Sequence, residues 1–407
     1  MKESKKKINL SLFLLVLFYP ILALFGLKGK LKDGNRGAYV ALAFILGFYG
    51  YLYPPVGDMY RYAMDFELYS DVSFTQFLIL APLYNKDFLL PFLDWILAQL
   101  GLVNDWTRFF FIFLGSLLTF RIFYEVREES QIRNSKAAAS LFLVYLLLMN
   151  INFILFRFGL AMCFFVYGYY LLLYKNIKMG YLWVGLAIFC HFGISPLLFP
   201  LVFSQILGYN GNKSVSVILM IMILFADIDV ADQIIRKLPF SDSMVDYLSV
   251  YTSGFWKEEY LQEVSLNYKI FQVLNKVGYY ALFFFYIKHH RPCKVSAFID
   301  MMLAVMVILS PMKAMFGRFV IVLNFILAIN FISIMFYEWR VIRFQYTKKI
   351  FLYIGIFITM VSIYAKRHEL ALSDEYLLLA PTVMIVNHSY DSHWIETNVD
   401  ANGDFKR

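Results

Sequence analysis

Charged residues are scarce in this chain. Asp, Glu, Lys and Arg together make up 16% of its 407 residues, whereas soluble globular domains carry about 25%. Hydrophobic residues make up 60%, and the mean hydropathy is +0.62. This composition excludes intrinsic disorder, a small disulfide scaffold and a soluble enzyme with a single membrane tail. It indicates a polytopic membrane protein.

Cysteine is also rare, and the common motifs of metal and nucleotide sites are missing. The three cysteines, Cys163, Cys190 and Cys293, have no paired spacing, and two of them stand in apolar runs. Neither a disulfide framework nor a zinc site is therefore indicated. The sequence contains no Gly-rich phosphate loop with lysine, no His-Glu-x-x-His and no Gly-x-Ser-x-Gly. Asp227 and Asp229 form an Asp-x-Asp pair of the kind that can bind a metal, although so short a pattern is common by chance.

Apolar runs, in contrast, fill most of the chain. A hydrocarbon core of roughly 30 Å needs about 20 apolar residues per helix. Runs that suit a span occupy residues 8–26, 37–53, 108–124, 137–153, 158–174, 181–207, 214–226, 270–287, 295–310, 318–337 and 349–364. The sequence therefore predicts an all-α polytopic membrane protein with about 11–13 transmembrane or re-entrant helices. We expect one transmembrane domain over 1–366 and a partly disordered C-terminal tail over 367–407.

Some apolar regions do not fit a simple span. Segments 74–83 and 88–103 are short or interrupted by proline and aspartate, which is typical of re-entrant or interfacial pieces. The run 181–207 is too long for one untilted helix and contains glycine and proline, so we expect a break near Gly193–Ser195. The stretch 376–386 in the tail is too short to span.

The distribution of positive charge predicts which loops face the cytoplasm. Lys and Arg concentrate in four short loops, at 28–36, 175–178, 288–294 and 340–349. The outer loops are then about 54–106 and 227–269, and the net charge of +8 is a topology signal, not a nucleic-acid surface. The run 8–26 is interpreted as the first membrane helix. One crossing there would separate the lysines at 2–7 from loop 28–36, although both prefer the inside.

Arg157 is the strongest candidate for a functional residue at membrane depth. An ionisable group there costs about 2.5–3.5 kcal/mol on insertion scales and usually has a function. Eleven residues make about three helical turns, so Arg157, Ala161 and Gly168 share one stripe of a helix. Small residues on that stripe would let a neighbouring helix approach and leave Arg157 facing a cavity. The alternative is an interfacial arginine that reaches toward water from a helix end.

His191 stands between an apolar helix and the expected break. Imidazole exchanges protons near neutral pH, which suits a general base at a sugar hydroxyl. Because irregular backbone is not tolerated facing lipid, a break usually lines a polar cavity. The alternative is a structural histidine whose hydrogen bonds are satisfied.

Other polar residues occur near the ends of two further helices. Lys313 and Arg318 lie five residues apart at the start of a late span, and Arg forks match phosphate oxygens. Asp58, Tyr60 and Arg61 lie in the first outer loop, where carboxylates and aromatic rings can bind sugars. The alternatives are ordinary interfacial charge and a solvated loop.

Four of these elements together resemble a known family. A Gly-Asp-x-Tyr-Arg-Tyr element at 57–62 follows the second span, and an Arg-x-Gly-Leu-Ala element begins at Arg157. A His-x-x-x-Ser-Pro element begins at His191, and a Gly-Arg pair ends at Arg318. The set is similar to the EpsG-like branch of the Wzy-type polysaccharide polymerases. The spacing from Arg157 to Gly168 matches the arginine–glycine spacing of Wzy proteins, whereas no glycine follows Arg318 at that spacing.

The resemblance implies a multi-spanning (GT-C-like) glycosyltransferase of the bacterial plasma (inner) membrane. It would join undecaprenyl-diphosphate-linked oligosaccharide repeat units on the outer face into a capsule, an exopolysaccharide or an O-antigen. His191 would be the base, while Arg157 and Arg318 would stabilise the lipid diphosphate. The implied substrate-binding residues are Asp58, Tyr60, Arg61, Lys313 and Gly168. The implied partners are the lipid-linked oligosaccharides, the lipid bilayer, a chain-length regulator and a flippase, with no metal, cofactor or nucleic acid.

Three other functions fit the same sequence. A lipid-phosphate-sugar-dependent glycosyltransferase would add a single sugar, with Asp58 as base, and the size of its product would distinguish it from a polymerase. Paired broken helices in the two halves would favour a flippase or transporter of lipid-linked oligosaccharides. The sequence indicates only one broken segment, which counts against transport. A membrane acyltransferase also fits a single intramembrane histidine.

Overall fold

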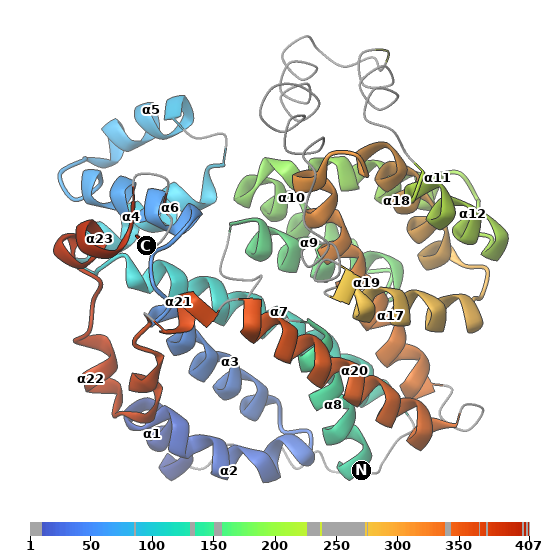
Figure 1. The fold of residues 1–407 in the computed structure, drawn as a ribbon, viewed down its shortest axis with the longest axis horizontal. Coiled ribbons are helices and arrows are strands. Elements are labelled where there is room, and N and C mark those ends of the chain that lie inside the picture. Colours follow the sequence, from blue (N-terminus) through green and yellow to red (C-terminus); the bar gives the residue numbers. More distant parts are fainter. Residues whose placement is uncertain are drawn as a thin grey trace. The chain divides into compact units, whose positions relative to one another are not determined.

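The computed structural model of the protein is built from helices (Figure 1). It describes residues 10–84, 87–130, 135–149, 157–225, 237, 273–274, 276–337, 343–365, 367–371, 373–400, 403 and 406. No strand occurs among these residues. The chain divides into two compact units. The first contains Met1–Tyr170, Ile177–Ile194 and Met335–Arg407, and the second contains Leu171–Asn176 and Ser195–Ile334.

Most helices belong to the first unit. They are α1 (Leu10–Phe18), α2 (Pro20–Lys32), α3 (Arg36–Tyr51), α4 (Asp58–Leu68), α5 (Phe74–Tyr84), α6 (Leu89–Gln99), α7 (Asp105–Glu129), α8 (Ser135–Met149), α9 (Arg157–Leu173), α10 (Gly180–Cys190), α20 (Phe344–Ala365), α21 (Arg367–Ala371), η3 (Glu375–Leu379), α22 (Thr382–Val386) and α23 (Ser392–Asn398). The second unit holds α11 (Leu198–Ile206), α12 (Lys213–Ile223), α17 (Val277–Lys288), α18 (Lys294–Leu309) and most of α19 (Lys313–Tyr337). The 3-10 helix η2 (Phe192–Leu197) contains the boundary between the units.

Three of the described helices are long and apolar enough to cross a membrane, namely α7, α19 and α20. Seven further apolar helices have between 10 and 17 residues. Large apolar side chains such as Phe25 on α2 and Phe284 on α17 are exposed, as expected for surfaces that contact lipid. The chain is therefore an all-α polytopic membrane protein, as the sequence predicted.

The first apolar run differs from the prediction. The single membrane helix expected over 8–26 is wrong, because α1 ends at Phe18 and α2 begins at Pro20. Proline has no N–H and keeps the preceding residue out of the helical region, and Tyr19 accordingly has φ -149° and ψ 79°. Helices of 9 and 13 residues are about 14 and 20 Å long, less than the hydrocarbon core. The conflict between loop 28–36 and the N-terminal lysines, which lie outside the described residues, therefore no longer arises.

The expected break in the run 181–207 is confirmed. Helix α10 ends at Cys190, η2 follows, and α11 begins only at Leu198. In the second unit, the backbone N–H of Cys293 donates to the carbonyl oxygen of Asn210 at 2.5 Å. This bond brings the loop after α11 to the predicted cytoplasmic loop 288–294.

The first predicted outer loop is helical. Residues 54–106 contain α4, α5 and α6, and the indole N–H of Trp95 on α6 donates to the carbonyl oxygen of Val72 at 2.8 Å. The second predicted outer loop, 227–269, lies outside the described residues apart from Lys237.

Helices α3 and α7 pack along each other (Figure 1). Two glycines on α3 permit the close approach. A Cβ atom at Gly47 would lie 2.6 Å from the ring of Phe109, and one at Gly50 would lie 2.5 Å from the carbonyl oxygen of Arg108. The C-terminal end of α3, from which the chain leads to α4, is thereby held close to α7.

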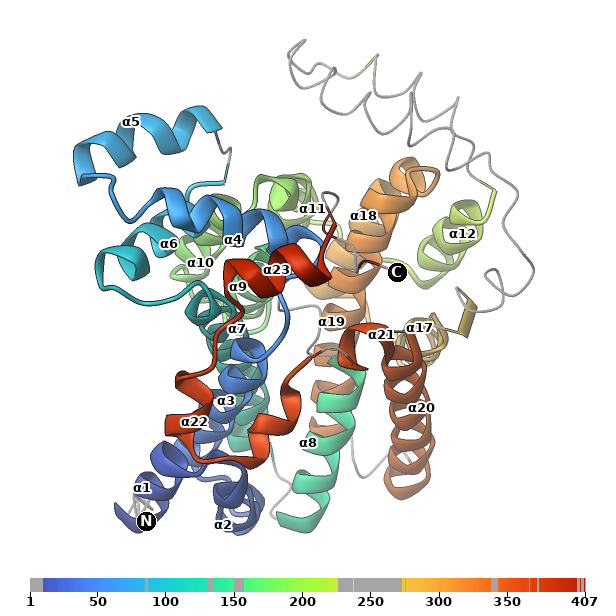
Figure 2. The same ribbon diagram turned by 60° about the vertical axis from the view of Figure 1, so that its left-hand side comes forward.

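The C-terminal tail, expected to be partly disordered, forms short helices in its described residues. Helix η3 lies against α2 and α3, and α22 lies against α1 (Figure 2). Ile385 belongs to an apolar cluster with Phe48 and Phe109, and Leu377 packs against that cluster. The apolar stretch 376–386, too short to span, packs against α3 and α7 instead.

Candidate functional site

Asp87 is the centre of a polar cluster in the first unit. It lies between α5 and α6, and its side chain is only 8% exposed. The carboxylate oxygen Oδ2 accepts from Nδ1 of His191 at 2.7 Å and lies 3.1 Å from Nη1 of Arg157. The other oxygen, Oδ1, accepts from the backbone N–H of Phe192 at 2.8 Å. One carboxylate therefore holds the two residues that the sequence singled out.

The break after α10 brings His191 to this carboxylate. His191 has an extended backbone, with φ -156° and ψ 112°, so the helix ends before it. A broken helix leaves backbone N–H groups without helical partners, and Asp87 accepts from one of them at Phe192. The ring of Phe158 meets the imidazole edge-on, with 5.7 Å between ring centroids. The break thus both releases the His191 side chain from the helix and holds it in place.

Arg157 is the first residue of α9 and is held by Tyr62 from α4. Its Nε atom donates to the hydroxyl oxygen of Tyr62, and its guanidinium carbon lies 4.6 Å from the centroid of the same ring. The thiol of Cys190 donates to the carbonyl oxygen of Arg157 at 3.5 Å, which links the start of α9 to the end of α10. Arg157 is thus fixed from three elements and is 21% exposed.

The charges in the cluster favour an ionised Asp87. Burial alone would raise the pKa of the Asp87 carboxyl, but the hydrogen bond and charge of His191, the N–H of Phe192 and the charge of Arg157 together lower it below its ordinary value. On α4, partial burial raises the pKa of Asp65, and the charge of Arg157 opposes that rise. Arg157 therefore acts on carboxylates from two elements.

This arrangement can perform general base chemistry. An ionised carboxylate on Nδ1 holds a proton on that nitrogen, so the other nitrogen, Nε2, can take a proton from a substrate. Among the described residues, no hydrogen-bond partner of His191 Nε2 is found. Gly193 lies close to this nitrogen, since a Cβ atom added to Gly193 would lie 3.0 Å from Nε2.

The residues predicted from the sequence have different outcomes. Arg157 and His191 come together as expected, and Gly168 forms the predicted close helix contact, because its Cβ would lie 2.7 Å from the carbonyl oxygen of Gly180 on α10. Arg61 is exposed and Tyr60 half-buried on α4, and among the described residues neither is seen in contact with the cluster.

The remaining predicted residues lie at other positions. Arg318 is half-buried on α19, in the second unit, so a joint site with Arg157 stays a prediction. Asp58 begins α4 and Lys313 begins α19, and predictions about their side chains lie outside the described part. Within the described ranges, no three His, Cys, Asp or Glu side chains gather as metal ligands, and the expectation of no metal stays a prediction.

Sequence reasoning missed Asp87 and Tyr62. Asp87 is one of several acidic residues in an outer loop, and nothing in its neighbourhood distinguishes it. Tyr62 did carry a signal, since it completes the Gly-Asp-x-Tyr-Arg-Tyr element and lies four residues after Asp58 on the same helix.

Comparison with known proteins supports the resemblance drawn from the motifs. No curated protein and no solved structure matches the chain. The model of the family described as the EpsG family matches residues 38–378, a range that includes the whole cluster around Asp87. Because this match covers well over half of the sequence, the chain belongs to the EpsG family.

Proposed function

We propose that the protein is a membrane glycosyltransferase that joins lipid-linked oligosaccharide repeat units into a surface polysaccharide. Membership of the EpsG family supports a polysaccharide-polymerase-like role in general. The observation that carries the proposal is the cluster of a paired histidine and an arginine around Asp87. The substrates proposed are repeat units on undecaprenyl diphosphate, at the outer face of the bacterial plasma membrane.

The reaction proposed is a displacement at the anomeric carbon of the donor chain. His191 Nε2 takes the proton of an acceptor hydroxyl while the acceptor oxygen forms a bond to the anomeric carbon. The bond between that carbon and the diphosphate oxygen breaks, and the electron pair leaves with the lipid diphosphate. Asp87 keeps the Nδ1 proton in place and stabilises the imidazolium that forms. The imidazolium then returns its proton to the diphosphate or to water.

Arg157 supplies positive charge for the leaving diphosphate. A guanidinium carries five N–H donors in a fixed plane and binds phosphate oxygens in pairs. The contacts with Tyr62 and Asp87 use Nε and Nη1 and fix the orientation of that plane. We propose that Arg318 and Lys313 of α19 supply further cations to the same diphosphate.

Other parts of the proposal concern sugars and partners. Asp58, Tyr60 and Arg61 on α4 are proposed to position sugar rings, and Gly168 supports the site by holding α9 against α10. A chain-length regulator and a flippase are the protein partners proposed.

The experiment is a product assay in a deletion strain. The gene is restored as wild type, His191→Ala, Arg157→Lys or the control His393→Ala, whose side chain is exposed on α23. Surface and lipid-linked glycans are then separated by size. We expect His191→Ala to lose the polymer and to accumulate a single lipid-linked repeat unit on the outer face. Arg157→Lys should shorten or reduce the polymer, because lysine cannot bind two oxygens in a plane.

Two of the competing functions would leave different glycans in the deletion strain. Accumulation of the repeat unit on the inner face would indicate a flippase, and loss of one sugar from an otherwise normal glycan would indicate a single-sugar transferase. Unchanged polymer in the deletion strain would reject the polysaccharide function. Normal polymer from a well-folded His191→Ala protein would reject the base assignment alone.

A further inference from the structure

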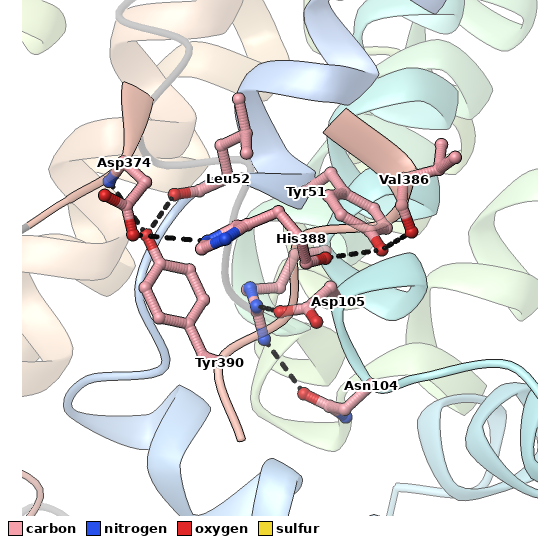
Figure 3. Close-up of polar contacts among 9 residues, drawn as sticks. Tyr51, Leu52, Asn104, Asp105, Asp374, Val386, His388 and Tyr390 are labelled. Carbon is pink, nitrogen blue, oxygen red and sulfur yellow. Dashed lines mark hydrogen bonds and ion pairs between the residues drawn. The ribbon is translucent and has the colours of Figure 1, made fainter. Parts of the chain in front are cut away.

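The described C-terminal residues 373–400 and 403, here called the C-terminal clasp, hold the turn that leads from α3 to α4. The hydroxyl of Tyr390 donates to the carbonyl oxygen of Leu52 at 2.7 Å and accepts from the N–H of Asp374 at 3.0 Å (Figure 3). Tyr390 is only 7% exposed, so both bonds are shielded from water. One tyrosine therefore ties two parts of the clasp to the end of α3.

A second tyrosine makes the reciprocal contact from α3. The hydroxyl of Tyr51 lies 3.1 Å from the carbonyl oxygen of Val386 and 3.0 Å from that of His388 (Figure 3). Nε2 of His388 lies 3.3 Å from a carboxylate oxygen of Asp374, which closes the clasp on itself. Tyr51, the last residue of α3, and Leu52, the next residue, are thus held by clasp residues more than 330 positions later in the chain.

A buried ion pair on α7 lies next to the clasp. Arg108 of α7 pairs with Asp105, and its Nη1 donates to the side chain of Asn104 at 2.9 Å. The guanidinium carbon of Arg108 lies 6.0 Å from the ring centroid of Tyr390. The ring of Tyr390 therefore covers a charge pair that is almost fully buried, which favours one fixed position for the ring.

The clasp also reaches the first residue before α4. The backbone N–H of Gly57 donates to the carbonyl oxygen of Gly403 at 2.7 Å, and an added Cβ at Gly403 would lie 2.7 Å from the carbonyl oxygen of Gly57. Both glycines have positive φ, 61° and 88°, which most other residues avoid. Ribbon views from two directions show α23 near α4 (Figures 1 and 2).

Helix α4 connects these contacts to the candidate site. It begins at Asp58, directly after Gly57, and carries Tyr62 little more than one turn later. Tyr62 is buried and holds Arg157 by its hydroxyl and by its ring. A short helix is a rigid connection, so the position of its first turn determines where Tyr62 meets Arg157.

We propose that the C-terminal clasp is a positioning element of the site, acting through α4 and Tyr62 on Arg157. The inference rests on the proposed function, in which Arg157 stabilises the leaving diphosphate. Tyr390 is then a positioning residue, because it touches neither substrate nor the reacting atoms. The competing explanation is that the clasp only stabilises α3, in which case its loss would act independently of Tyr62.

The experiment is a double-mutant cycle between Tyr390→Phe and Tyr62→Phe in the full-length protein. The substrate is the lipid-linked repeat unit extracted from the deletion strain, and initial rates of polymer formation are measured in membrane vesicles at several substrate concentrations. The matched control is Tyr376→Phe, since Tyr376 belongs to the clasp but is 67% exposed. Protein amount and thermal unfolding in detergent are measured for every variant.

The proposal expects three results. Tyr390→Phe lowers kcat about fivefold, the effect of one ordinary hydrogen bond, while KM changes little. Tyr376→Phe is unchanged. The double variant is no slower than Tyr62→Phe alone, because both substitutions loosen the same contact with Arg157.

Two results would overturn the proposal. The first is a Tyr390→Phe enzyme with wild-type kcat. The second is a double variant whose fold loss in kcat is the product of the two single losses, which would show that the clasp only stabilises α3. Failure of the proposed function is distinguishable, because the deletion strain would then make unchanged polymer whatever the clasp variants do.

Discussion

The imidazole of His191 and the carboxylate of Asp87 are bonded at 2.7 Å although 104 positions separate them in the chain. His191 follows the end of α10, and Asp87 precedes α6, so each lies outside a regular helix. The pairing fixes which nitrogen of the imidazole carries a proton and leaves the other nitrogen, Nε2, next to Gly193. It turns two residues at helix ends into one acid–base unit.

The first prediction concerns the charge of Asp87. Asp87→Asn keeps the shape of the side chain but removes the charge that stabilises a protonated His191, so we expect polymer formation to fall about 100-fold or more. Initial rates in membrane vesicles would measure this. Asp71→Asn, in an exposed position between α4 and α5, is the control and should be unchanged. An Asp87→Asn enzyme with half the wild-type rate would contradict the pairing as a catalytic unit.

The second prediction is a pH dependence of stability that Asp87 causes. The pKa of its carboxyl is lowered in the folded protein, so its stabilising effect is complete above the unfolded pKa of about 4. That effect is lost as the pH falls through the folded value. Thermal unfolding in detergent should show a difference between wild type and Asp87→Asn that shrinks as the pH falls below about 4. A difference that grows as the pH falls below about 4 would contradict the lowered pKa of Asp87.

The sequence predicts a site residue when its own segment marks it, and does not when its role depends on distant partners. Arg157 and His191 are predictable, because a polar side chain inside an apolar run is costly wherever the run folds. Asp87 is not, because its importance depends on partners that the fold brings from two distant helices. The same holds for the C-terminal stretch 376–386, whose length excludes a span but does not reveal that α3 and α7 offer it an apolar surface.

Pro20 differs from Asp87, because the sequence next to it contains the signal that ends the helix. A proline after the mostly apolar residues 10–18 is expected to end the first helix, but the high hydropathy of 8–26 favours a single span. The break near Gly193 was predicted correctly, since the run around it was too long for one helix.

The third prediction concerns the close approach of Gly193 to Nε2 of His191. Gly193→Ala would place a methyl group 3.0 Å from Nε2, the nitrogen that is proposed to take the proton, so we expect at least a tenfold lower rate with unchanged folding. Gly185→Ala on α10 is the matched control, because a Cβ there meets nothing within 4 Å. Equal rates for the two variants would show that substrate does not approach past Gly193.

The fourth prediction concerns the contact between α9 and α10. Gly168→Ala would place a Cβ 2.7 Å from the carbonyl oxygen of Gly180 and 2.8 Å from a methyl group of Val184, so we expect destabilisation by about 1–3 kcal/mol. Gly29→Ala on α2 meets nothing within 4 Å and should stabilise by up to about 1 kcal/mol, since alanine favours helix. Opposite shifts of the unfolding temperature in detergent would confirm the close contact, and a stabilised Gly168→Ala would contradict it.

The fifth prediction tests the membrane orientation on which the outer site depends. Cys163 and Cys190 are buried, whereas Cys293 is exposed and lies in the predicted cytoplasmic loop 288–294. A membrane-impermeant maleimide should therefore label the protein at Cys293 in inside-out vesicles and leave intact spheroplasts unlabelled. Cys293→Ser is the control that should abolish labelling, and its polymer formation should remain normal, because Cys293 is exposed and serine is close to cysteine in size. Labelling of intact spheroplasts at Cys293 would contradict the predicted orientation, in which loop 288–294 faces the cytoplasm.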